Sequence, residues 1–358
     1  MAVGRFQDGL RGAREFVAAQ GGQIAPLPIS EEELNPDVQD DLSVHAYALE
    51  DTARTYPVGY RYPDDAGASE FRFFEDGRQR TIQVGHIPAQ YGDNLVIIPV
   101  HYFVVGAVIL QRDNRKLNVW NEPEIIQGIF VARSLVPNQT ELETFEREGL
   151  RVVDTEATTA GRSDYYDMRR RALREAKKLR LTAEQTLITR WRESGEAKES
   201  FLVVDGTLMN MRDERNVDRC IGVSKSFGSR YFDVSTHNRI LTLQEGERSW
   251  TFRFHDAEDQ QDDLRKGGRE RISWYLRLRS RANGEPEFGL IRAEISKRHA
   301  DQAQEYAERF SKSLISDRLP TSYPAPRWDK HLYPIRQCER YLSSVMPSSA
   351  TIIASMRG

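Results

Sequence analysis

Apolar residues recur at two spacings along this chain of 358 residues, and the change between them marks its elements. Between residues 71 and 130 they stand in short runs or alternate with polar residues, which is typical of strands. Brief turn sequences separate the runs, so consecutive strands should pair antiparallel. The predicted strands are 71–74, 81–84, 95–110 in one or two pieces, 117–120 and 125–130.

A helical spacing replaces this pattern after Pro137. Helices are predicted at 140–148 and from 163 to about 191, where Thr182 and Gln185 form a capping box, so the second segment is one helix or two abutting ones. The order of the elements fits an α/β domain with a mixed sheet between helical layers. The later predicted elements are strands at 201–204, 220–223, 250–254, 272–278 and 289–295, a helix from about 297 to 314, and a last helix opened by Pro334.

The N-terminal region has a character of its own. Residues Phe6, Leu10, Ala13, Phe16 and Val17 recur at helical spacing, and an acidic stretch at 30–50 follows. We therefore expect a helical and acidic extension at 1–50 and a second unit at 51–358. The N-terminal helix either packs against its own domain or docks a partner.

Composition narrows the class of protein. Hydrophobic residues make up 39% of the chain, enough for a sizeable core, and the formal charge of -3 leaves room for a locally basic groove. Cys220 and Cys338 have no zinc-site spacing, which disfavours a disulfide framework or structural zinc. The longest apolar stretch, 95–110, is broken by polar residues and is too short to span a bilayer as a helix. We expect an intracellular, cytoplasmic protein without a membrane segment.

Two Asp-Gly pairs are the strongest candidates for chemistry. Asp76-Gly77 and Asp205-Gly206 each follow an apolar run, so each is predicted to bring a carboxylate to the end of a buried strand. The alternative for each is an ordinary turn. Carboxylates on neighbouring strands suit a divalent metal, and hydrolysis of a phosphodiester with two metals about 4 Å apart needs three or four of them.

Further carboxylates stand on the predicted helices. Glu184 lies at the edge of the inward stripe of the helix before the second Asp-Gly strand, with Glu175 and Glu193 as competitors. Glu339 flanks the apolar stripe of the last helix, where its carboxylate can lean toward the sheet. By residue type alone, a helical Glu is more often solvated or paired with Arg.

Five short motifs, taken in order, resemble the NurA family of nucleases. The resemblance runs from about residue 71 to 345 and implies an RNase H-like mixed sheet flanked by helices, here with an N-terminal extension and inserted strands. The motifs are Asp76-Gly77-Arg78-Gln79-Arg80, Ala183-Glu184, Asp205-Gly206-Thr207-Leu208, Ile221-Gly222-Val223-Ser224-Lys225-Ser226 and Tyr333-Pro334.

The resemblance also implies roles for individual residues. Asp76, Glu184 and Asp205 would hold Mn²⁺ or Mg²⁺, and Lys225 and Tyr333 would lie near the scissile phosphate. Members of the family place a His or Asp shortly after the Tyr-Pro pair, and this chain departs from that pattern. Glu339 is the best substitute as a metal ligand, and His331, just before the helix, is the second candidate.

Basic residues supply candidate contacts to DNA. The helix at 169–180 carries seven Arg and Lys side chains, which either attract phosphates or form a solvated face that balances nearby acids. The predicted DNA-binding residues are Arg78, Arg170, Arg174, Lys177 and Arg212.

The expected function is a metal-dependent DNA nuclease, acting in DNA end processing or antiviral (anti-phage) defence. The resemblance implies a homodimer docked on a HerA-like hexameric ATPase, and the chain itself has no G-x-x-x-x-G-K-[ST] motif to drive translocation. One alternative is a non-catalytic DNA-binding or assembly subunit of the ATPase complex. The other is an RNase H-like nuclease that acts on RNA or an RNA-DNA hybrid. The sequence leaves exonuclease or endonuclease action open.

Overall fold

A computed structural model gives the fold, and it describes most of the chain. The described residues are 2–24, 46–59, 69–91, 93–114, 116–147, 150–156, 164–211, 213–226, 231–255, 269–281, 285–320, 328–348 and 350–352. Most of the predicted acidic stretch at 30–50 and the predicted DNA-binding residue Arg212 lie outside these ranges.

Five strands form the centre of one large sheet, in the spatial order β7, β5, β4, β9, β10. Of these five, the three that come first in the chain pair antiparallel, β4 with β5 and β5 with β7, whereas β9 is parallel to both β4 and β10. The long helix α3 precedes β9 and packs on β4, β5 and β7. The central bounds are β4 Phe73–Tyr91, β5 Asn94–Asp113, β7 Glu124–Val131, α3 Tyr165–Glu193, β9 Leu202–Asp205 and β10 Cys220–Ser224. The mixed sheet flanked by helices, predicted from the sequence, is confirmed.

Inserted strands extend the sheet on both sides of this centre. Beyond β10 lie β14, β13, β12 and β2, each antiparallel to its neighbour, and β8 closes the other edge, parallel to β7. The outer strands are β1 Gln23–Ile24, β2 Ala46–Ala48, β3 Tyr56–Pro57, β6 Lys116–Val119, β8 Arg151–Asp154, β11 Glu247–Arg248, β12 Phe252–His255, β13 Glu270–Arg277 and β14 Leu290–Ser296. The remaining α-helices are α1 Ala2–Ala19, α2 Gln139–Arg147, α4 Glu214–Val217, α5 Val234–Leu241, α6 Ala303–Ser316 and α7 Tyr333–Val345.

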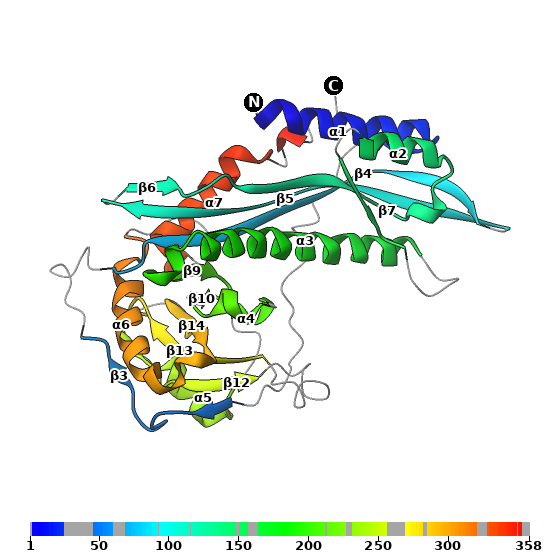
Figure 1. Ribbon diagram of the computed structural model, residues 1–358. Coiled ribbons are helices and arrows are strands. Elements are labelled where there is room, and N and C mark those ends of the chain that lie inside the picture. Colours follow the sequence, from blue (N-terminus) through cyan, green and yellow to red (C-terminus); the bar gives the residue numbers. More distant parts are fainter. Residues whose placement is uncertain are drawn as a thin grey trace.

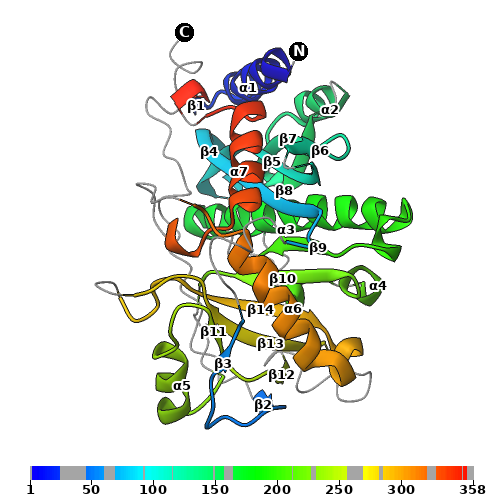
Figure 2. The ribbon, with the colours of Figure 1, turned by 90° about the vertical axis from the view of Figure 1, so that its left-hand side faces the viewer.

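Helices cover both faces of the central strands, which explains why β5 is apolar at nearly every position rather than at alternate ones. In Figure 1, α3 runs along one side of the β4–β5 hairpin, and α1 and α2 lie on the other. Figure 2 shows α7 crossing β4 on the side away from α3, and α7 contacts both β4 and β5. Residues at successive positions of β4 therefore meet different helices.

The first Asp-Gly pair is not a strand end, and this corrects the prediction from sequence. β4 continues through Asp76 and Gly77 to Tyr91, because Gly77 pairs with Ala107 of β5 and keeps an ordinary φ. Its other neighbour, β9, stops earlier, so Asp76 lies where β4 runs past the end of β9. The second pair agrees with the prediction, because β9 ends at Asp205.

Two helix predictions are settled by the structure. The segment predicted at 163–191 is one helix, and Thr182 bonds the carbonyl of Lys178 as an interior residue rather than as a cap. The apolar stripe of α1, including Phe6, Leu10 and Phe16, is buried in the main core. Since α1 packs on β4 and β7, the predicted boundary near residue 50 separates parts that touch, and it stays a prediction. Among the described residues, no helix is both long and apolar enough to cross a bilayer.

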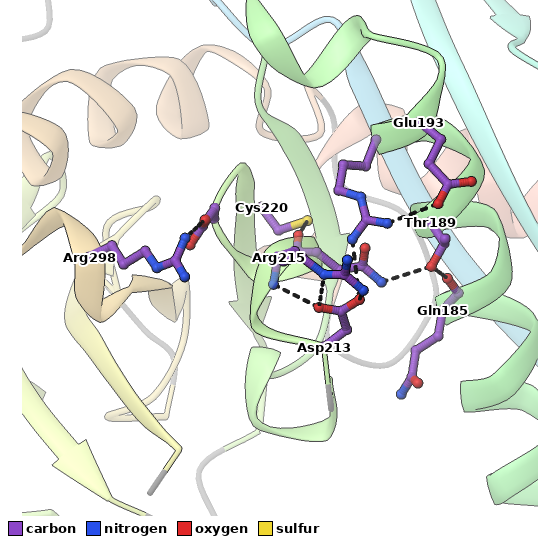
Figure 3. A network of polar contacts seen from close by, with 10 residues as sticks. Gln185, Thr189, Glu193, Asp213, Arg215, Cys220 and Arg298 are labelled. Carbon is purple, nitrogen blue, oxygen red and sulfur yellow. Dashed lines mark hydrogen bonds and ion pairs between the residues drawn. The ribbon is translucent and has the colours of Figure 1, made fainter. Parts of the chain in front are cut away.

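A polar network anchors α4 to the C-terminal part of α3 (Figure 3). The Asp213 carboxylate caps α4 and accepts hydrogen bonds from the Arg215 side chain at 2.8 and 3.0 Å and from Arg192 at 3.2 Å. Asn216 donates to Thr189 of α3 at 2.9 Å. The network thus fixes the segment that leads into β10.

This network gives a pH-dependent prediction for Asp213→Ala. The hydrogen bonds from Arg215 lower the pKa of Asp213 from 3.8 to about 2. A lowered carboxyl pKa contributes stability above the unfolded-state value and loses it as pH falls through the folded-state value. We expect the variant to lose about 1 kcal/mol of unfolding free energy at pH 7, and the loss to shrink between about pH 4 and pH 2. Urea unfolding at a series of pH values measures it, and a difference that grows on acidification contradicts it. Asp213→Asn keeps a capping side chain and isolates the ion pairs.

Candidate metal centre

Three carboxylates from three elements meet at one point. Asp76 of β4, Asp205 of β9 and Glu339 of α7 each offer an oxygen atom, and these atoms all lie within 4.8 Å of one another. The Asp76 residue is 6% exposed, whereas the side chains of Asp205 and Glu339 are 23% and 20% exposed. The cluster is therefore largely buried but open to solvent from the side of the last two residues.

Local sequence explains how each carboxylate reaches this point. Gly206 has a φ of +107°, a conformation that favours glycine and turns the chain away directly after Asp205. The register pairs Glu75 with Val204, which sets Asp76 beside the end of β9. In α7, the buried stripe includes Cys338, whose thiol donates to the carbonyl of Phe74 at 3.4 Å, and Glu339 follows it.

A buried glutamate fixes the loop after Asp205. Glu294 of β14 is fully buried and accepts hydrogen bonds from the Thr207 hydroxyl at 2.9 and 3.1 Å and from the Leu208 amide at 3.0 Å. Its charge is paired with Arg292 at 2.5 Å. The turn that carries Asp205 is thus tied to the neighbouring part of the sheet.

Burial and mutual repulsion disfavour the charged form of Asp76 in this cluster. Burial raises the pKa of Asp76 well above its ordinary value, and the negative charge of Asp205 raises it further. The positive charge of Lys225 acts in the opposite direction but does not cancel the rise. A cation bound among these oxygens would relieve both effects.

Lys225 lies inside the cluster. Its ammonium is 2.8 Å from Oδ1 of Asp205 and 3.9 Å from Oε1 of Glu339, and its side chain is only 8% exposed. Burial by itself would lower the pKa of this lysine, but the carboxylates of Asp205, Asp76 and Glu339 outweigh it and the pKa is raised. The lysine is therefore held as a cation.

His331 and Arg336 border the same cluster. Nδ1 of His331 is 3.7 Å from Oε1 of Glu339, and Arg336 forms an ion pair with the other oxygen of that carboxylate. Burial and the charge of Lys225 lower the pKa of His331 to about 4, so the imidazole is neutral near pH 7. The two residues named as candidates for the fourth ligand thus lie side by side, and Glu339 is the one that joins the two aspartates.

Glu184 approaches from the other helix and stands outside the three-carboxylate group. Its carboxylate pairs with Arg180 at 2.5 Å and lies over Gly77, where an added Cβ would be 2.0 Å from Oε1. Burial raises the pKa of Glu184 to about 7, with a further contribution from Asp205. Because Gly77 has no side chain, the Glu184 carboxylate can pass over it and reach the end of β9.

The sequence analysis missed Glu75 and the pairing of Arg180 with Glu184, although it counted Arg180 among the basic residues of the helix at 169–180. Glu75 is fully buried, and in the described part of the chain neither of its carboxylate oxygens has a hydrogen-bond partner. Burial and the charge of Glu184 raise its pKa well above the ordinary value. Arg180 faces the carboxylates from α3 and lines a hollow with Glu184 and Asp205. Two features of the sequence could have pointed to these residues. Glu75 stands directly before Asp76, and Arg180 stands four residues before Glu184, the spacing of an ion pair on a helix.

The remaining predicted residues lie around this centre in different ways. Tyr333 is 43% exposed at the start of α7, and Arg78 donates to the Ser343 hydroxyl of α7 at 2.8 Å. Arg174 and Lys177 are exposed on α3, and Arg170, also exposed, pairs with Asp167. With a rise of about 1.5 Å per residue, Arg170 lies roughly 21 Å along the helix axis from Glu184.

The donor set suits a hard divalent cation. Three carboxylates within reach of one point are ligands that Mg²⁺ and Mn²⁺ prefer, and no sulfur ligand is close enough to join them in the described cluster. Burial and the charge of Asp205 raise the pKa of Asp76, and a bound cation would offset both effects. The residues present therefore fit a divalent metal.

Comparisons with known proteins find similarity among solved structures but not among sequences. No protein-family model matches the chain, and no curated protein sequence matches it. The crystal structure of the NurA nuclease from Sulfolobus solfataricus is similar over 81% of this chain and 83% of that chain, with a TM-score of 0.43 and 13% sequence identity.

Proposed function

We propose that this protein is a metal-dependent nuclease that hydrolyses phosphodiester bonds of DNA. The observation that carries the proposal is the convergence of Asp76, Asp205 and Glu339, from three separate elements, within 4.8 Å. Buried carboxylates repel one another and are disfavoured by burial, and the three together carry more negative charge than Lys225 and Arg336 offset, which favours a bound cation. A divalent metal bound there supplies charge neutralisation and lowers the pKa of a water molecule for hydrolysis.

The chain's own residues have distinct roles in this proposal. Asp76, Asp205 and Glu339 hold the metal, and Glu184, reaching over Gly77, completes the ligand set or orients water. Lys225 offsets negative charge on the phosphate, and Tyr333 at the start of α7 contacts the same group. Neutral His331 lies beside Glu339, with Nδ1 3.7 Å from Oε1, and adds no competing positive charge.

The proposed DNA path follows α3. Exposed Arg174 and Lys177, with Arg170 farther out, form a basic track that leads toward the centre and would attract phosphates in a salt-dependent way. The sequence resemblance adds a HerA-like hexameric ATPase as partner and a homodimer as the working form, in DNA end processing or antiviral defence.

The proposal is tested by cleavage of linear DNA. We expect the full chain, alone or with its ATPase partner, to cleave duplex or single-stranded DNA with Mn²⁺ or Mg²⁺ and to stop when EDTA is added. Asp205→Asn should lower the rate about 1000-fold, since loss of one ligand costs several kcal/mol of transition-state stabilisation. Exposed Asp113, at the end of β5, serves as the control, and Asp113→Asn should cleave as the wild type does.

Other outcomes point to the alternatives. Faster cleavage of RNA or of an RNA-DNA hybrid than of matched DNA would assign the chain to RNase H-like action on those substrates. DNA binding without divalent-metal binding, and without cleavage in the complex, would make it an assembly subunit and overturn the nuclease proposal.

A further inference from the structure

The carboxylates of the metal centre have cations of the chain itself as partners. Lys225 pairs with Asp205 at 2.8 Å, Arg180 pairs with Glu184 at 2.5 Å, and Arg336 pairs with Glu339. Of these cations, Lys225 is the most buried, with 8% of its side chain exposed against 23% for Arg180 and 26% for Arg336.

The position of Lys225 sets it apart from the two arginines. Its ammonium touches one member of the three-carboxylate group and lies within 3.9 Å of a second. It also acts electrostatically on Asp76, the third member. A single positive charge thus stands among the oxygen atoms that a metal would use.

We propose that Lys225 is a built-in counter-ion that competes with the divalent metal for Asp205. In the metal-free protein its ammonium stabilises the clustered carboxylates, and a metal must displace it from Asp205 in order to bind. The displaced ammonium is then available to the phosphate of the substrate. This inference rests on the proposed function and adds a regulation of metal loading to it.

The physical reason is that two cations cannot share one carboxylate oxygen without repelling each other. At separations of a few ångströms, and in a buried site that water screens poorly, this repulsion opposes metal binding for as long as the ammonium stays on Asp205. Removing the ammonium should therefore strengthen metal binding, even though it removes a stabilising ion pair from the metal-free protein. If the lysine had a purely structural role, its replacement would have the opposite effect: the site would be less well ordered, and the affinity for the metal would fall.

The test is isothermal titration calorimetry, in which Mn²⁺ is titrated into the full chain. We expect Lys225→Met to bind Mn²⁺ at least tenfold more tightly than the wild type while its DNA cleavage falls. Lys225→Arg keeps the charge and should show no gain in affinity. Lys225→Gln, which keeps a polar side chain, should also gain affinity and serves if the methionine variant does not fold.

Lys330 provides a matched control. It is also a buried lysine, at 8% exposure, and its ammonium pairs with Glu287 at 3.3 Å and donates to the backbone carbonyl of Lys225 at 3.2 Å. Its replacement removes a nearby buried positive charge but leaves the Lys225 ammonium in place. We expect Lys330→Met to bind Mn²⁺ within about twofold of the wild type. If Lys330→Met gained as much Mn²⁺ affinity as Lys225→Met, the loss of any nearby positive charge would strengthen metal binding. That result would overturn the specific role of Lys225.

Thermal unfolding supplies a second readout. Without metal, Lys225→Met should unfold at a lower temperature than the wild type, and saturating Mn²⁺ should narrow this deficit, because a ligand that binds the folded state more tightly stabilises it more. Suppose that the wild type binds Mn²⁺ and cleaves DNA, but that Lys225→Met and Lys225→Gln bind Mn²⁺ no more tightly than the wild type. That result would overturn this inference and leave the proposed function standing. A wild type that binds no divalent metal would overturn the proposed function with it.

Discussion

Asp76→Asn should abolish cleavage and at the same time stabilise the metal-free protein. The asparagine keeps the shape of the side chain but removes one metal ligand, so we expect the cleavage rate to fall about 1000-fold. The stability gain follows from the raised pKa of Asp76, which reflects burial and the nearby charge of Asp205. We expect the unfolding free energy to rise by about 1 to 2 kcal/mol, as when other strained functional residues are neutralised.

The sign of the pH dependence sharpens this prediction. A carboxyl group whose pKa is raised by folding favours the folded state below its unfolded-state value and loses that contribution as pH rises. The advantage of Asp76→Asn should therefore be larger at pH 8 than at pH 4. Chemical denaturation at both pH values, without metal, measures it. If the variant is less stable than the wild type at pH 8, the contacts of the Asp76 carboxylate stabilise the folded state more than its buried charge destabilises it, and the prediction is wrong.

Metal should reverse the order of stability. Saturating Mn²⁺ should raise the melting temperature of the wild type more than that of Asp76→Asn, because only the wild type presents all three carboxylates. Exposed Asp113 again gives the control, since Asp113→Asn should change stability by no more than about 0.5 kcal/mol with or without metal.

Gly77→Ala should lower cleavage about 100-fold while the protein stays folded. A Cβ at this position would lie 2.0 Å from Oε1, 2.7 Å from Cδ and 2.8 Å from Cγ of Glu184, so the whole end of that side chain must move. A displacement of about 1 Å in an active site commonly costs a factor of about 100 in rate. Gly77 keeps an ordinary φ, so alanine introduces no backbone strain, and the effect isolates the space that Glu184 occupies.

Gly106 offers a matched control on the neighbouring strand. A Cβ at Gly106 would first meet the flexible Met346 thioether, at 3.0 Å, rather than a carboxylate. Steady-state cleavage and thermal unfolding of both variants separate the two effects. Gly77→Ala should lose rate beyond any loss of stability, and Gly106→Ala should not. Equal rates in the wild type and folded Gly77→Ala would argue against a role for Glu184 in the centre.

The sequence predicted those features of the site that depend on neighbouring residues. Asp205-Gly206 ends a strand because glycine readily adopts the positive φ that the turn requires, and that preference is local. The last helix begins at the Tyr333-Pro334 pair because proline suits a first helical turn. These local preferences suffice to predict Asp205 at a strand end and a helix that carries Glu339, without any tertiary contact.

The same reasoning failed at Asp76 because the answer lies in another strand. An Asp-Gly pair after an apolar run looks like a turn, but pairing of Gly77 with Ala107 keeps β4 extended. Glu75 was missed for a related reason. Burial of both faces of the sheet comes from α3 and α7, and nothing near residue 75 in the sequence reveals that two helices cover it.

The chain by itself thus determined the order of strands and helices, the mixed sheet and a set of candidate carboxylates, because spacing and turn chemistry act over a few residues. Only the tertiary structure decided which carboxylates meet. It joined Asp76, Asp205 and Glu339, set Lys225 among them and left Glu184 to approach over Gly77. The reason is physical: strand pairing and helix packing bring distant segments together, and the charge balance of the centre exists only after they do.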